Sequence, residues 1–101
     1  MQVVGKDKLQ DFWKKHNPAK KPLERWLDIT SKTNWSSWPK IKMSFPSVDM
    51  VKTKSGYYVV FDIGGNKYRL VTEIDFSGTI VVVEVVMTHS EYSKNKWKDK
   101  L

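Results

Sequence analysis

The spacing of apolar side chains predicts two helices near the start of the chain. One is predicted where apolar or aromatic side chains recur every three or four residues, at Leu9, Phe12, Trp13 and His16. A second is predicted where the same spacing returns, at Leu23, Trp26, Leu27 and Thr30. Pro22 indicates that the regular part of this second helix begins near it, because a proline deeper inside would remove a backbone hydrogen bond. Two short amphipathic helices in succession favour a hairpin lying on a sheet.

From Val48 onward the apolar period changes to two, which is the period of a β-strand. The predicted strands span Val48–Lys54, Gly56–Ile63, Lys67–Phe76 and Thr79–Met87, and a short strand is also expected at Met1–Val4. Turns are predicted at Gly64-Gly65-Asn66 and at Ser77-Gly78. The last strand is nearly all valine, which is typical of a central strand covered on both faces.

The remaining segments show no clear period. Residues 33–50 are expected to form an irregular loop pinned by aromatic packing, and Ser90–Leu101 to form a short helix or to fray. The order of elements predicts one α+β domain over residues 1–101. In this fold an N-terminal strand and a two-helix hairpin pack on a mostly antiparallel four-stranded sheet. Two short helices cannot cover both faces, so the other face should be partly open.

Composition restricts the class of protein. The 101 residues include 40% hydrophobic side chains and five tryptophans, enough for one folded domain with a modest core. There is no cysteine, which excludes disulfides, thiolate metal sites and a thiol nucleophile. No apolar run reaches about 18 residues, and the first residues lack the apolar core of a signal peptide. We therefore expect a cytoplasmic protein with no membrane partner.

The net charge of +7 is unevenly distributed along the chain. Residues 1–55 carry 12 basic and 5 acidic side chains, whereas residues 56–101 carry 6 of each. Four of the later bases are clustered, at Lys94, Lys96, Lys98 and Lys100. Such a surplus favours a polyanionic partner such as nucleic acid. The alternative is that the charge serves only solubility and that the lysine cluster is a solvated tail.

Five polar side chains suggest phosphodiester chemistry. Arg69 lies in a predicted strand, and His89 and Tyr92 follow the end of the valine-rich strand. Lys52 and Lys54 are two residues apart in a strand, so they should share a face. If the strands are neighbours, all five groups should converge on one edge of the open face. RNA cleavage by its own 2′-hydroxyl needs a base, a cation for the phosphorane and an acid, which histidine, arginine and lysine can supply.

Each of these residues also has a structural interpretation. Arg69 could simply pair with Glu73 or Glu84, and Tyr92 could be a hydrophobic lid. His89 could be an exposed residue with no role in catalysis, and Lys52 and Lys54 could protect an edge strand from pairing. His16 falls on the apolar stripe and is expected to be a packing residue. Two separated histidines and scattered carboxylates predict neither a metal site nor a cofactor.

The chain also resembles the HigB-type toxins of the RelE-like superfamily along nearly its whole length. The resemblance includes the stretches KKHNPAKKPLERWL (Lys14–Leu27), FPSVDMV (Phe45–Val51), VVFDIGGNKYRL (Val59–Leu70) and MTHSEYSK (Met87–Lys94). It implies a RelE-like fold and a translation-dependent mRNA endonuclease acting in the ribosomal A site. It also implies inhibition by a HigA-like antitoxin with a helix-turn-helix domain.

The resemblance implies a role for each candidate residue. Arg69 matches an arginine that contacts the scissile phosphate, Tyr92 a tyrosine that stacks on or orients a nucleotide, and His89 the HigB histidine. Lys52 and Lys54 resemble the paired strand lysines of RelE. The candidate catalytic residues are thus Arg69, His89 and Tyr92, and the candidate RNA-binding residues are Lys52, Lys54, Lys67, Lys94 and Lys96. The match does not distinguish the general base from the general acid.

Two other functions fit the same features. A non-catalytic RNA-binding module would share the basic surface. A toxin of the RelE/ParE type that acts on a protein target such as gyrase would share the fold, but it would not depend on Arg69 and Tyr92.

Overall fold

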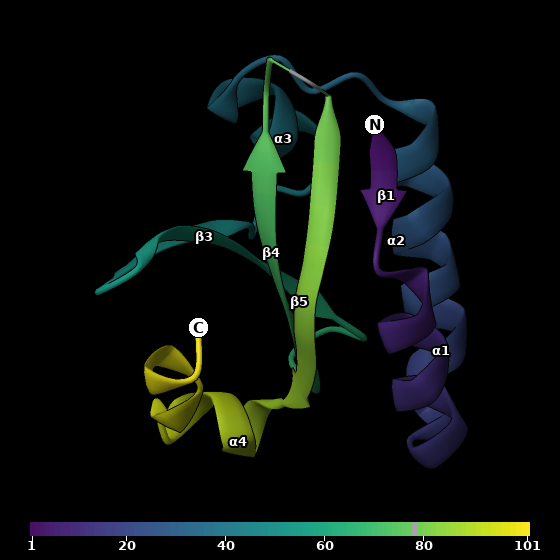
Figure 1. Cartoon of the computed structure of the whole chain (residues 1–101). Helices are drawn as coiled ribbons and strands as arrows, with labels where there is room; N and C mark the ends of the chain where they lie inside the picture. The colour runs from purple at the N-terminus through teal and green to yellow at the C-terminus, as the bar shows by residue number, and fades with distance from the viewer. Residues whose placement is uncertain (78) are drawn as a thin grey trace.

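The computed structural model describes residues 1–77 and 79–101, and it shows a five-stranded mixed sheet with helices on both faces (Figure 1). The strands are β1 (Gln2–Val4), β2 (Asp49–Thr53), β3 (Gly56–Ile63), β4 (Tyr68–Asp75) and β5 (Ile80–Thr88). Their spatial order is β1-β5-β4-β3-β2, with β1 parallel to β5 and the other pairs antiparallel. The predicted α+β class is confirmed, and the N-terminal strand joins the sheet as its fifth member.

Two helices cover one face of the sheet. They are α1 (Lys6–Lys15) and α2 (Lys20–Lys32), joined by the short 3₁₀-helix η1 (Asn17–Ala19), and Figure 1 shows them side by side next to β1. Leu9, Leu23 and Trp26 from the predicted stripes are buried against strand residues. His16 stacks on Phe12 with ring centroids 4.3 Å apart, which confirms its packing role. The helix α2 begins two residues before Pro22, which lies in its first turn.

The predicted irregular loop at residues 33–50 is partly wrong, because Trp38–Ser44 form the helix α3. Pro39 stands in the first turn of this helix, where no backbone donor is needed. Ile41 is fully buried, and a single buried turn leaves no period long enough to recognise. The expected aromatic packing is present, since Trp35 stacks on Phe61 with centroids 5.9 Å apart.

The C-terminal segment covers part of the other face. It forms the short helix α4 (His89–Ser93) and the 3₁₀-helix η2 (Lys96–Asp99), seen in Figure 1 on the side of the sheet away from α1 and α2. Trp97 of this segment packs into a second buried cluster with the strand residues Tyr58, Val60, Val71 and Met87. No helix within residues 1–77 or 79–101 is long and apolar enough to cross a membrane. Of the predicted turn at Ser77-Gly78, Gly78 lies outside the described residues.

The turn between β3 and β4 sets the register of the site. Gly64 and Gly65 have φ values of +63° and +70°, which glycine adopts without the steric cost of a side chain. The strands resume with Ile63 opposite Tyr68, so the connection is four residues long, one more than predicted. This register places Asp62 directly opposite Arg69.

Candidate active site

Arg69 is a buried cation on the face of the sheet that carries α4. It lies on β4 between Asp62 of β3 and Met87 of β5, and directly paired residues in a sheet share a face. The residue is 8% exposed. A buried charge is costly unless it is paired and hydrogen-bonded, so the groups around Arg69 decide what it can do.

Three contacts hold the guanidinium in place. Its Nε lies 3.1 Å from Oδ1 of Asp62 in an ion pair. One terminal nitrogen donates to the carbonyl of Tyr68 at 3.0 Å, and the other donates to Oδ1 of Asn66. A guanidinium has five N–H groups, so these contacts leave one on each terminal nitrogen. Two N–H groups therefore remain without a partner among the described residues, and a guanidinium N–H is a strong donor to phosphate oxygens.

Tyr92 lies against this cation and is itself supported by Trp97. The ring centroid of Tyr92 is 5.7 Å from Cζ of Arg69, within the range of a cation–π contact. The same ring stacks on Trp97 with centroids 5.2 Å apart, and the Trp97 indole donates to the Tyr92 carbonyl at 3.2 Å. Arg69, Tyr92 and Trp97 therefore form a continuous series of contacts. We refer to these three residues as the stacked series.

The helix that carries Tyr92 begins at a capping box. The Thr88 side chain accepts from the Glu91 amide at 3.2 Å, and the Glu91 carboxylate accepts from the Thr88 amide at 3.0 Å. The hydrogen bond from the Thr88 backbone is the main reason that the pKa of Glu91 lies below its ordinary value. These bonds fix the start of a helix that is too short to be stable by itself.

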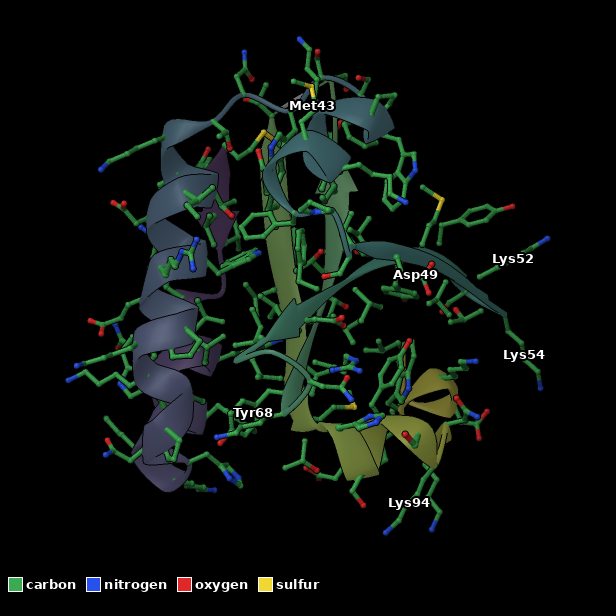
Figure 2. The ribbon with its side chains drawn as sticks, turned by 180° about the vertical axis from the view of Figure 1, so that it is seen from behind. Met43, Asp49, Lys52, Lys54, Tyr68 and Lys94 are labelled. Carbon is green, nitrogen blue, oxygen red and sulfur yellow. The ribbon has the colours of Figure 1, made fainter. Side chains whose placement is uncertain are left out.

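The environment of Tyr92 keeps its phenol protonated. Burial is the main cause that raises the pKa of Tyr92 above the ordinary value, and the negative charge of Asp49 adds to it. The positive charge of Arg69 acts in the opposite direction, with a smaller effect than burial. At neutral pH Tyr92 can therefore donate a hydrogen bond but is poorly suited to accept a proton as a base. Figure 2 shows Asp49 at the start of β2.

Replacing Asp49 by asparagine should lower the pKa of Tyr92 towards its ordinary value, because a charge that disfavours the phenolate is removed. Replacing Arg69 by alanine should raise the pKa of Tyr92 further, because a positive charge that favours the phenolate is removed.

Folding raises the pKa of Tyr92, so the contribution of the neutral phenol to stability is complete below about pH 10. This contribution is lost as the pH rises through the pKa of the folded state. NMR of ¹³Cζ-labelled tyrosine, assigned with Tyr92→Phe, measures both shifts. An unchanged or higher pKa in Asp49→Asn contradicts this account.

His89 is the first residue of α4 and is exposed. Its amide donates to the carbonyl of Lys67 at 2.9 Å, which joins α4 to the β3–β4 turn. Its Nδ1 lies 3.3 Å from Oγ of Ser93, one helical turn further on. The structure thus brings His89 to the same short helix as Tyr92, at the solvent-facing border of the site.

Lys52 and Lys54 do not join this group, so the expected convergence of all five side chains is wrong. Lys52 is opposite Tyr57, five residues along β3 from Asp62, a separation of roughly 17 Å along the strand. An odd number of residues also places Lys52 on the other face of the sheet. Figure 2 shows Lys52 and Lys54 pointing outward from the free end of the β2–β3 hairpin.

The other candidate lysines lie nearer the site. Lys67 is exposed in the β3–β4 turn between Asn66 and Tyr68. Lys94 follows the last turn of α4 and lines a shallow hollow with Lys96 and Trp97. In Figure 2, Lys94 extends into solvent below α4. These positions can attract a phosphate backbone without touching the guanidinium.

Four residues of the site were not foreseen from the sequence: Asp49, Asp62, Asn66 and Trp97. The alternative interpretation of Arg69, an ion pair with Glu73 or Glu84, names the wrong partner, because the structure pairs Arg69 with Asp62. A prediction of the correct turn length, four residues after Ile63, would have paired Asp62 with Arg69 and placed Asn66 in the turn beside it. Within the described residues there is no group of three or more histidines and carboxylates placed to hold a metal ion.

Comparisons with known proteins match almost the whole chain. The model of the HigB toxin family, the RelE-like toxic component of a toxin-antitoxin system, matches residues 19–95. The mRNA interferase HigB of Escherichia coli O6:H1 is 26% identical over 94 residues, which cover 93% of this chain and 90% of the relative. The mRNA interferase toxin HigB of Escherichia coli K12 is 30% identical over 92 residues, with 91% and 88% covered. A Shigella flexneri mRNA interferase HigB matches equally well. The family match includes Arg69, His89 and Tyr92, and the chain therefore belongs to the HigB toxin family.

Proposed function

We propose that this toxin is a metal-independent endoribonuclease that cuts mRNA on the translating ribosome. The observation that carries the proposal is the guanidinium of Arg69. It is fixed by three contacts, retains two N–H donors, and lies beside a tyrosine that stays protonated. Relatives that cover most of the chain are named mRNA interferases, which supports mRNA as the substrate.

The chemistry follows from what these side chains can do. The 2′-hydroxyl of one nucleotide loses its proton and attacks the adjacent phosphorus to form a 2′,3′-cyclic phosphate, while the bond to the 5′-oxygen breaks and that oxygen takes up a proton. Arg69 stabilises the additional negative charge on the phosphorane through its two remaining N–H groups. Tyr92 donates a hydrogen bond to a phosphate oxygen or stacks on a base. His89, at the exposed border, transfers a proton as acid or base.

The lysines have a binding role in this proposal. Lys67, Lys94 and Lys96 attract the RNA backbone near the site. Lys52 and Lys54 lie too far from Arg69 to take part in proton transfer, and we assign them to contacts with more distant phosphates. The ribosome supplies the geometry of the substrate, because it holds the codon in a defined conformation.

As the toxic component of a toxin-antitoxin system, the protein has an antitoxin partner. We propose a HigA-like antitoxin that carries a helix-turn-helix DNA-binding domain. We also place the toxin in the cytoplasm, where its ribosomal substrate is found.

The chemistry of the cut ends tests the proposed reaction. After induction of the toxin, new mRNA ends inside translated frames should carry a 5′-hydroxyl, with a 2′,3′-cyclic phosphate or a 3′-phosphate on the other fragment. A 5′-hydroxyl end can be ligated only after treatment with a kinase, which gives a direct assay. The same transcript with its start codon removed is the control and should stay intact. Ends with a 5′-phosphate would rule out attack by the 2′-hydroxyl, and equal cutting of the untranslated transcript would rule out dependence on the ribosome.

A further inference from the structure

A cleft of about 480 Å³ lies beside the candidate active site and has no role in the chemistry above. It lies between the first half of α2, the segment that follows α3, and the β3–β4 turn. Two basic side chains line it, Lys21 and Arg25, and apolar surface is supplied by Pro22, Phe45 and Pro46. Its volume is within the range of small-ligand sites, roughly 300–1,000 Å³.

The cleft exists because β2 is shorter than β3. The strand β2 begins at Asp49 opposite Val60, so the segment Phe61–Ile63 has no β2 residue beside it. The segment Ser44–Ser47 crosses this gap instead and forms part of the wall. On the side of the turn, a Cβ added to Gly64 would lie 3.7 Å from Cγ of Pro22, whereas a Cβ added to Gly65 would meet nothing within 4 Å.

One carboxylate connects the cleft to the active site. Asp62 lines the cleft and is also the ion-pair partner of Arg69, at 3.1 Å from its Nε. It is the one acidic residue among those that line the cleft, and Arg69 balances its charge. The cleft therefore presents the net positive charge of Lys21 and Arg25, and Asp62 is the residue that it shares with the site of Arg69.

We propose that this cleft binds one nucleotide of the RNA, adjacent to the phosphate held by Arg69. This inference rests on the proposed function and adds a second RNA-binding site to it. The base lies against Pro22, Phe45 and Pro46, and the phosphate of the same nucleotide contacts Lys21 and Arg25. Apolar flat surface combined with a basic rim is typical of sites for single-stranded nucleic acid. The shared Asp62 favours RNA over an acidic peptide, since it links the cleft to Arg69 around the edge of β3, where neighbouring nucleotides of one strand can occupy the two positions.

Trp26 supplies a direct probe of this cleft. It lines the cleft, is 1% exposed, and its indole N–H has no acceptor among the described residues. Its indole resonance can be assigned with Trp26→Phe and followed by NMR. The ligand to use is a trinucleotide with 2′-O-methyl riboses, which has no nucleophile and cannot be cut.

Titration with this trinucleotide should shift the Trp26 resonance in a saturable way. The double variant Lys21→Glu with Arg25→Glu should bind it about tenfold more weakly or worse, because two charge-assisted contacts are lost. The matched control is Lys20→Glu with Lys32→Glu. It makes the same change of net charge on the same helix, at exposed lysines that do not line the cleft.

Three results would overturn the proposal. The two double variants could weaken binding equally, which would mean general attraction to charge. The Trp26 resonance could stay unchanged at millimolar trinucleotide. It could also respond to an acidic peptide of the antitoxin and not to RNA, which would assign the cleft to the antitoxin.

Failure of the cleft proposal can be distinguished from failure of the proposed nuclease, because binding of an uncleavable ligand does not depend on catalysis. If the toxin cuts mRNA but the Trp26 resonance does not shift with the trinucleotide, only the cleft proposal is refuted. If the Trp26 resonance shifts with the trinucleotide but the protein does not cut mRNA, only the proposed nuclease activity is refuted.

Discussion

Replacing Arg69 by alanine should abolish mRNA cutting and relieve growth arrest. Removing one donor that stabilises a developing negative charge typically lowers kcat by about 10²–10³-fold, and Arg69 offers two donors to the phosphorane in the proposed reaction. The loss should be in the chemical step, because the lysines that attract RNA remain. Induction of the variant in cells with mapping of mRNA 5′ ends measures the effect. Single-turnover cleavage on purified ribosomes gives its size.

Two further variants separate catalysis from folding. Arg69→Lys keeps the charge but has no planar fork, so it should recover little activity. Asp62→Asn keeps the shape of the ion-pair partner while the cation stays in place, so it should reduce cutting less than Arg69→Ala. Circular dichroism and thermal melts establish which variants are folded. A folded Arg69→Ala protein that cuts mRNA at the normal rate would exclude this site, and arrest without any cuts would indicate a protein target.

Replacing Trp97 by alanine should cause a large loss of stability together with a loss of cutting. Trp97 is 6% exposed and belongs to the small cluster beneath the C-terminal segment. Removing a buried tryptophan side chain typically costs about 3–5 kcal/mol. A domain of this size has only about 5–15 kcal/mol of stability in total. Because Trp97 supports the ring of Tyr92, the phenol should also lose its fixed position beside Arg69. Chemical denaturation and the cleavage assay measure the two effects.

Trp97→Phe provides the comparison for this prediction. It retains an aromatic ring against Tyr92 but lacks the indole donor to the Tyr92 carbonyl, so it should lose about 1–3 kcal/mol. It should keep most of its activity. The matched control is Trp13→Ala, since Trp13 is only partly buried and packs on the opposite face of the sheet. A Trp97→Ala protein with unchanged stability and unchanged cutting would show that the stacked series has no supporting role.

The sequence predicted the regular elements well because their side-chain periods are long and clear. The eight-residue strand Gly56–Ile63 has the predicted bounds, and the other strands differ by one residue at most of their ends. The helix α3 was missed because it has only seven residues, begins beside a proline and buries a single isoleucine. Its segment is held by tertiary contacts with Phe61, and local periodicity carries no information about such contacts.

The site was harder to predict because register decides which side chains meet. The sequence pointed to Arg69 and Tyr92, and the structure places them in contact. A connection one residue shorter between β3 and β4 would have paired Arg69 with Phe61, on the opposite face from Asp62. The sequence also predicts that side chains along β2 alternate between the two faces of the sheet. It does not determine whether Lys52 lies on the same face as Arg69. One residue of register exchanges the two faces of a strand, so a pattern alone could not have placed these lysines.

The position of β1 affects how the toxin is made. The strand β1 pairs with β5, whose residues are added nearly eighty positions later during synthesis. Contacts between such distant segments form slowly, and none can form before the second segment has left the ribosome. The pairing of β1 with β5 therefore waits until residues 80–88 have been synthesised, and α4 and η2 are synthesised after them. A ribosome that has not yet added Tyr92 and Trp97 therefore carries a toxin chain whose candidate site is not assembled.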